Sequence, residues 1–146
     1  MIALPSEIHL ENFVVLQSRY KFIPPKKEKI DSKEVFKSYS IDIDFAHLNN
    51  ENGSIQVFTK ISVNECENPS PGYSLFVEGG ALFSLDITSN LSEAEQKNLK
   101  YFSTVNILIG YLRNTLMSMS ASSPMGPYLL PPININDLFK KKSDSK

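Results

Sequence analysis

Two stretches of alternating apolar and polar residues, 39–45 and 55–63, stand on either side of the sequence Asn-Asn-Glu-Asn-Gly at 49–53. Strict alternation is typical of an antiparallel strand that has one face on the core and the other in water. The Asn and Gly residues between the two stretches suit a tight turn, because they adopt backbone angles that other residues avoid. The sequence therefore predicts a hairpin of two half-buried strands.

Two further stretches have the composition of strands. Residues 8–22 are rich in β-branched and aromatic side chains, and their alternation is lost at 13–16, as expected of a strand that bends or is covered on both faces. Residues 73–86 follow a Pro-rich turn, and the pair Gly79-Gly80 within them suits a bulge or a sharp bend. With residues 23–33 as an exposed connection, the sequence predicts four strands in succession.

A long helix is expected after the last strand. Ser92 and Glu95 form a capping box, and apolar residues then recur at three- and four-residue steps on two separate flanks. One flank would cover the sheet, whereas the other needs a partner. Gly110 costs roughly 1 kcal/mol relative to Ala inside a helix, which another backbone packed closely there would explain. We therefore predict a subunit interface formed by Tyr101, Val105, Leu108, Gly110 and Leu112.

The remainder of the chain is predicted to hold a proline-rich connection at 120–132, a short helix at 134–139 and a flexible polar tail at 140–146. A length of 146 residues allows one domain, which we place at 1–139. The predicted fold class is α+β, with four antiparallel strands and one long and one short helix.

Composition excludes several classes of function. A net charge of −1 argues against nucleic-acid binding, and one cysteine with two histidines allows neither an intrachain disulfide nor a Cys/His zinc cage. The sequence has no signal peptide or membrane span, so a cytoplasmic location is expected. Because acids, bases and nucleophiles are not clustered, we expect a binding protein without cofactor rather than an enzyme.

Two segments carry a resemblance to a known family. Residues 77–85, Val-Glu-Gly-Gly-Ala-Leu-Phe-Ser-Leu, and residues 106–139, which end in Asn-Ile-Asn-Asp-Leu-Phe, resemble the SecB family of bacterial protein-export chaperones. The resemblance extends over about 8–139. It implies a four-stranded antiparallel Greek-key sheet with helices on one face, a dimer-of-dimers assembly, and binding of unfolded client chains in apolar grooves without ATP.

The chain also departs from this family. SecB proteins that pass clients to the SecA motor are strongly acidic and carry carboxylates on the outer sheet face, whereas this chain has Gln17, Lys21 and Phe76 there. Three roles stay open: a general export chaperone that delivers clients to SecA, a SecB-like chaperone dedicated to the antitoxin of a toxin-antitoxin system, and a structural adaptor with one fixed protein partner.

Candidate client-contact residues are large apolar side chains of the strands and flexible methionines at the end of the long helix, because both suit varied apolar partners. Alternation places Phe76 on the outer surface of the sheet, opposite to Leu75 and Val77. The predicted contacts are Phe13, Val15, Tyr20, Phe22, Phe58 and Phe76, with Met117, Met119 and Met125 at the groove rim.

Overall fold

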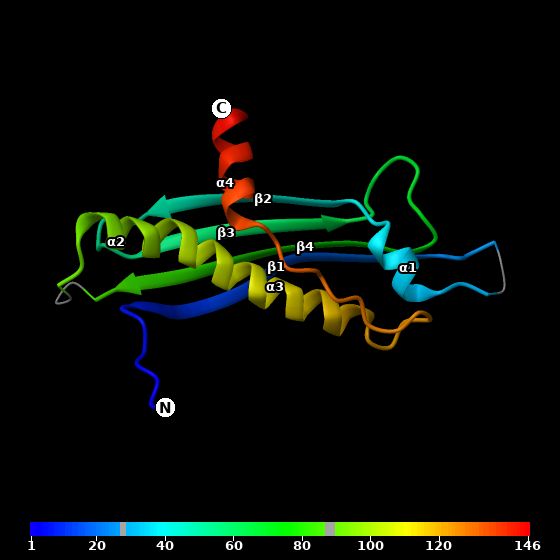
Figure 1. The fold of residues 1–146 in the computed structure, drawn as a ribbon, viewed down its shortest axis with the longest axis horizontal. Coiled ribbons are helices and arrows are strands. Elements are labelled where there is room, and N and C mark those ends of the chain that lie inside the picture. The colour runs from blue at the N-terminus through cyan, green and yellow to red at the C-terminus, as the bar shows by residue number, and fades with distance from the viewer. Residues whose placement is uncertain (27–28, 87–89) are drawn as a thin grey trace.

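The structure is a computed structural model that describes residues 1–26, 29–86 and 90–146. Its core element is an antiparallel sheet with the strand order β1-β4-β3-β2, which is a Greek-key arrangement (Figure 1). The predicted α+β class and the four strands are confirmed. The strands are β1 (Ile8–Ile23), β2 (Ile41–Asn49), β3 (Ile55–Val63) and β4 (Gly72–Leu85).

The predicted hairpin is formed by β2 and β3, which pair in continuous register from Ile41 with Val63 to Asn49 with Ile55. The expected irregularity at Gly79-Gly80 lies in the neighbouring strand: β1 shifts register between Val15 and Gln17, opposite Gly79, whereas β4 pairs with β3 without a shift. The reason for glycine is close packing: a Cβ on Gly79 would lie 2.8 Å from Cδ2 of Leu112.

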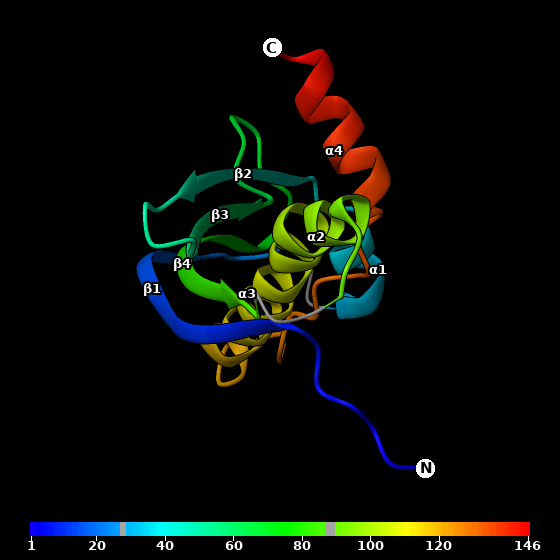
Figure 2. The same ribbon diagram turned by 90° about the vertical axis from the view of Figure 1, so that its left-hand side faces the viewer.

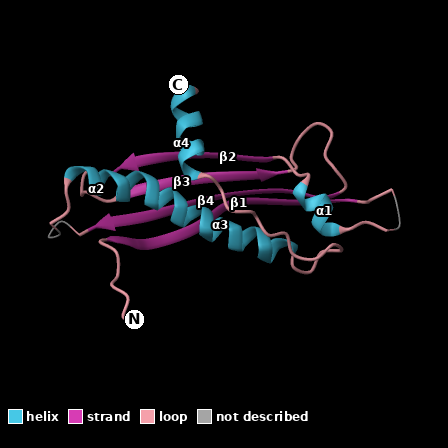
Figure 3. Ribbon diagram, viewed as in Figure 1, coloured by secondary structure: helices cyan, strands magenta, loops and turns pink. Residues whose placement is uncertain are grey.

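The helices are α1 (Ser32–Lys37), α2 (Glu93–Asn98), the π-helical turn η1 (Leu99–Ser103), α3 (Thr104–Ser120) and α4 (Ile135–Asp144) (Figure 3). The Ser92 capping box is present at the start of α2, as predicted. Helix α1 lies partly in the predicted connection and was not expected; residues 27 and 28 of that connection lie outside the described residues. Among the described helices, none is long and apolar enough to cross a membrane.

The described helices cover one face of the sheet, and none of them lies on the other face, which we call the bare face (Figure 2). Helix α3 fills the core of the protomer, and Val105, Leu108 and Leu112 are fully buried there. The prediction that these three residues form a subunit interface is therefore wrong. The second apolar flank of α3, with Ile109 and Leu116, is also buried, because the segment after α3 folds back and adds to the same core.

The other two residues of the predicted interface lie elsewhere. Tyr101 is half-buried against the ring of His47, 5.1 Å between centroids, and Gly110 is on the open side of α3, where an added Cβ would meet no atom within 4 Å. The predicted tail at 140–146 is also wrong, because α4 continues to Asp144. The Asn134 side chain caps this helix, and an ion pair of 2.7 Å between Lys141 and Asp137 supports it.

Candidate functional site

A groove lies between β2 and α4 and has a volume of about 560 Å³. Strand β2 is at the edge of the sheet, so no other strand of the described residues pairs with its outer backbone groups. One wall of the groove consists of residues 41–45 of β2, and the other of residues 133–145, which include α4. We call this feature the edge groove; its apolar side chains are Ile41, Ile43, Phe45, Ile133 and Leu138.

The α4 wall is held by few contacts. No residue of α4 is fully buried, and the helix points away from the sheet over the edge of β2 (Figures 1 and 2). Its main anchor is the ring of Phe139, whose centroid lies 4.2 Å from that of Phe102 and 4.5 Å from that of Phe45. The groove therefore has one wall within the sheet and one wall attached by a few partly buried residues, Ile135, Leu138 and Phe139.

Charged groups in the edge groove are mostly paired with one another. Asp44 accepts a hydrogen bond from Lys142 of α4 and lies 3.9 Å from the ammonium group of Lys60. The bond from Lys142 is the main reason that the pKa of Asp44 lies below its usual value. With these charges balanced, the apolar strips and the free backbone edge are the features that can hold a ligand. Such a surface suits an extended apolar polypeptide.

A second hollow, of about 450 Å³, lies on the open side of α3 around Gly110. Its lining is largely apolar and includes Ile107, Tyr111, Met117 and Leu129. We call it the Gly110 hollow. Because an added side chain at Gly110 would meet nothing inside the protomer, the glycine has no packing role within one chain. Among the residues that the structure describes, no group of three or more His, Cys, Asp or Glu side chains is placed to hold a metal ion.

The predicted client contacts on β1 lie at the opposite edge of the sheet from the edge groove. Phe13 packs against Tyr111, and Phe22 packs against Tyr73. Both rings are partly buried at the margin of the core. Val15 and Tyr20 are exposed. Phe58 is on the bare face of the sheet, half-buried beside Gly80. None of these residues lines the edge groove.

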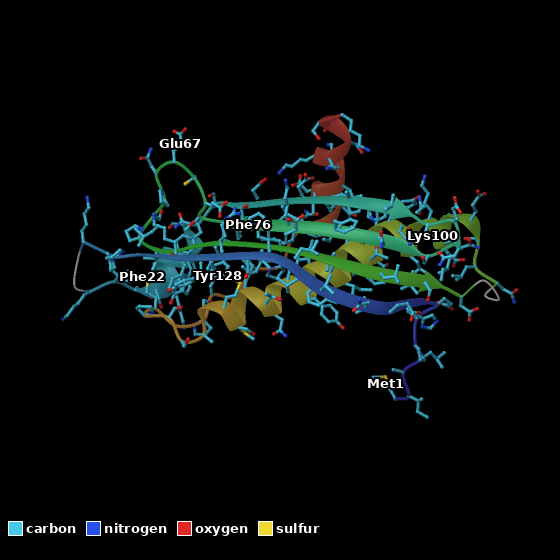
Figure 4. The ribbon with its side chains drawn as sticks, turned by 180° about the vertical axis from the view of Figure 1, so that it is seen from behind. Met1, Phe22, Glu67, Phe76, Lys100 and Tyr128 are labelled. Carbon is cyan, nitrogen blue, oxygen red and sulfur yellow. The ribbon has the colours of Figure 1, made fainter. Side chains whose placement is uncertain are left out.

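Phe76 is on the outer face of the sheet, as alternation predicts (Figure 4), but it is only 8% exposed. The guanidinium carbon of Arg19 lies 4.0 Å above its ring, and Arg19 is held there by a hydrogen bond of 2.6 Å to Glu65. The prediction that Phe76 offers a client contact is therefore wrong, because the neighbouring strand covers the ring with a cation.

The predicted methionines are divided between two places. Met117 lines the Gly110 hollow, whereas Met125 is half-buried against the core, and its backbone N–H donates a 2.7 Å hydrogen bond to the hydroxyl oxygen of Tyr73. Met119 is half-buried on α3. The groove residues that the sequence analysis missed are Ile41, Ile43, Phe45, Ile133 and Leu138. Alternation marks the first two as apolar, but it does not show that β2 is an edge strand.

No protein-family model matches the chain, and no curated protein matches it in sequence. Among solved structures, it is similar to the Mycobacterium tuberculosis SecB-like chaperone Rv1957 in complex with a ChAD peptide from the antitoxin HigA1. The TM-score is 0.59, with 12% identity over 88% of each chain. It is also similar to a protein of unknown function from Streptococcus agalactiae, with 10% identity, a TM-score of 0.46 and coverage of 89% of this chain and 100% of that one. The fold of this chain is the SecB-like fold.

Proposed function

We propose that this protein is an ATP-independent holdase that binds extended apolar segments of other polypeptides in the edge groove. The observation that carries the proposal is the groove itself: an unpaired strand edge beside Ile41 and Ile43, faced by a weakly attached helix. A client backbone would add to the edge of β2, while alternate client side chains would contact the apolar walls. This activity is binding, not catalysis.

The fold similarity supports a dedicated form of this role. The SecB-like chaperone of M. tuberculosis is seen with a peptide from an antitoxin. We therefore propose that the favoured client is a segment of one partner protein, such as an antitoxin. General export, with transfer of clients to SecA in the cytoplasm, is the alternative. The covered Phe76 and a net charge of −1 do not provide the acidic outer face that SecA-docking relatives carry.

We also propose that the protein is a homo-oligomer, a tetramer built as a dimer of dimers. Two surfaces of the protomer support this. Strand β1 has a free edge of 16 residues with exposed Val14, Val15 and Leu16, and such an edge readily pairs with another chain. The Gly110 hollow is a second apolar surface that a further protomer would cover. Light scattering at micromolar concentration tests this, and a stable monomer would contradict it.

The holdase activity is tested by suppression of aggregation. Several unrelated chemically unfolded proteins are diluted into buffer with one chain of this protein per client chain, and turbidity is followed. Suppression for all of them supports a general holdase, whereas suppression for a single antitoxin-like partner supports the dedicated role. No suppression for any client, and no binding to that partner, would disprove the proposal.

The location of the site is tested by a matched pair of variants on β2. Ile43→Ser changes the wall of the edge groove. Leu48→Ser changes a side chain that does not line the groove and is 53% exposed. We expect at least a tenfold loss of client affinity for Ile43→Ser and no change for Leu48→Ser, since a buried Ile contact is worth about 1.5 to 3 kcal/mol. Equal effects of the two substitutions would place the client elsewhere.

A further inference from the structure

We infer that His47 and Thr104 are positioning residues for the edge groove: they hold the π-helical turn η1 in the register that presents Phe102 to α4. The inference rests on the proposed role of that groove in client binding. It concerns two residues that do not line the groove.

The turn η1 interrupts a continuous helix between α2 and α3. A π-turn is rare, because it is wider than an α-helical turn. Two side chains supply donors to its carbonyl groups. The hydroxyl of Thr104 donates to the Lys100 carbonyl at 2.6 Å, and Nε2 of His47, on β2, lies 3.2 Å from the Tyr101 carbonyl oxygen. Thr104 is fully buried, so its hydrogen bond is shielded from water.

The hydrogen bond from His47 requires a proton on Nε2, which the neutral ring with that tautomer provides. Burial lowers the pKa of His47 below its usual value, so the ring is neutral at pH 7. The ring is also packed edge-on against Tyr101 and Phe45, at centroid distances of 5.1 Å and 5.7 Å. His47 thus ties the turn to the sheet at a defined position.

The same turn positions the anchor of α4. Phe102 lies within η1, and its ring stacks on Phe139 of α4 with an interplanar angle of 26°. If η1 changed to a regular α-helix, the chain before the turn would rotate by about 100° relative to α3, which is the rotation of one residue. Phe102, inside the turn, would rotate through part of this angle. The stack on Phe139 would be lost, and this ring would keep only its contacts with Phe45, at 4.5 Å, and His47, at 6.5 Å. Helix α4 would then be held more weakly.

The test uses the chain of 146 residues and first measures α4 without any client. In His47→Leu, which removes the donor, we expect hydrogen exchange at residues 138–142 to become about tenfold faster or more. His47→Gln should retain the wild-type rate, because its side-chain amide can donate from nearly the same place. An unchanged rate in His47→Leu, or no rescue by Gln, would overturn the inference.

A matched control separates positioning from simple loss of stability. Ser120 is also a fully buried hydroxyl at a helix end; it donates to the Leu116 carbonyl and accepts from the Tyr128 N–H. Ser120→Ala should lower the unfolding midpoint without faster exchange in α4. Faster exchange in α4 with Ser120→Ala, equal to that of His47→Leu, would show a general effect and overturn the inference.

The second measurement is the affinity for an unfolded client, reduced α-lactalbumin labelled with a fluorophore. We expect about tenfold weaker binding for His47→Leu and near wild-type binding for His47→Gln. If the wild-type protein does not bind this probe or any other client, the proposed function fails, while the exchange rates of α4 still decide the positioning role. If binding is unchanged although α4 exchanges faster, His47 does not act on the groove.

Discussion

Helices α3 and α4 are attached to the sheet in opposite ways. Seven residues of α3 are buried, whereas α4 has none. Helix α4 is held by the partly buried side chains of Ile135, Leu138 and Phe139 and by the bond from Lys142 to Asp44. The difference separates two roles. Helix α3 is part of the fold, because its buried residues belong to the same core as those of the sheet. Helix α4 forms a wall of the edge groove, where substitutions can change binding without unfolding the chain.

The largest effect is expected from a substitution in α3. Leu112 is fully buried, and its Cδ2 atom fills the space above Gly79. Leu112→Ala removes three buried carbon atoms and leaves a cavity, so the free energy of unfolding should fall by about 2 to 5 kcal/mol. Urea denaturation followed by circular dichroism measures this. A loss below about 1 kcal/mol would mean that α3 is not the main cover of the sheet.

The segment between the two helices provides a pH-dependent test. Burial raises the pKa of Tyr128 to about 12, from 10.0 in a free tyrosine. Between these pH values the unfolded chain loses a proton that the folded chain keeps, so the free energy of unfolding decreases as pH rises. The free energy of unfolding lost in this way is at most about 2.7 kcal/mol, because each tenfold difference in proton affinity is worth about 1.4 kcal/mol.

Tyr128→Phe should remove this part of the alkaline destabilisation. Among the described residues the Tyr128 hydroxyl has no hydrogen-bond partner, so its removal should cost little at pH 7. Unfolding curves at pH 7 and pH 11 for both proteins provide the comparison. Equal pH dependence in the two proteins would show that Tyr128 is not buried as the structure places it. Burial raises the pKa of Tyr39 and Tyr73 as well, so some dependence should persist in the variant.

A substitution in α4 should change binding more than stability. Phe139 is half-buried and supplies the main apolar anchor of the helix. We expect Phe139→Ala to reduce the free energy of unfolding by only about 1 kcal/mol, because Phe139 is itself half-buried and the core residue that its ring covers, Phe45, lies at the margin of the core, yet to weaken client binding about tenfold. Urea denaturation measures the change in stability. Isothermal titration with a client that the wild-type protein binds measures the change in affinity. A loss of stability as large as that of Leu112→Ala would remove the distinction between the two helices.

The fold could be predicted because its signals are local. Alternation in 39–45 and 55–63, the Asn-Gly turn and the Ser92 capping box each specify one element from adjacent residues. The role of α3 could not be predicted correctly from two apolar flanks. The pattern does not show that the segment with Tyr128 and Leu130 returns to cover the second flank, since that depends on the path of the chain through space.

The candidate site was missed for a similar reason. The edge groove is formed by residues 41–45 and residues 133–145, which are far apart in the sequence. Alternation identifies Ile41 and Ile43 as apolar, but the edge position of β2 follows from the strand order, which no local pattern contains. Aromatic residues on the outer face of a strand did not reliably indicate client contacts. A cation that is distant in the sequence, such as Arg19, can cover a ring such as that of Phe76.

The smallest effect on the protomer is expected at Gly110, and it shows whether α3 has a role beyond the fold. An added Cβ there meets nothing within 4 Å, so Gly110→Ala should stabilise the protomer by up to about 1 kcal/mol through helix propensity alone.

Gly110→Leu would also fit one chain, but it would fill the Gly110 hollow. If a second protomer covers this hollow, Gly110→Leu should shift the assembly to smaller species in light scattering, whereas Ser118→Leu, exposed on α3 outside the hollow, should not. Unchanged assembly in Gly110→Leu would mean that the hollow stays open to water, and the free edge of β1 would then be the surface left to carry the contact between protomers.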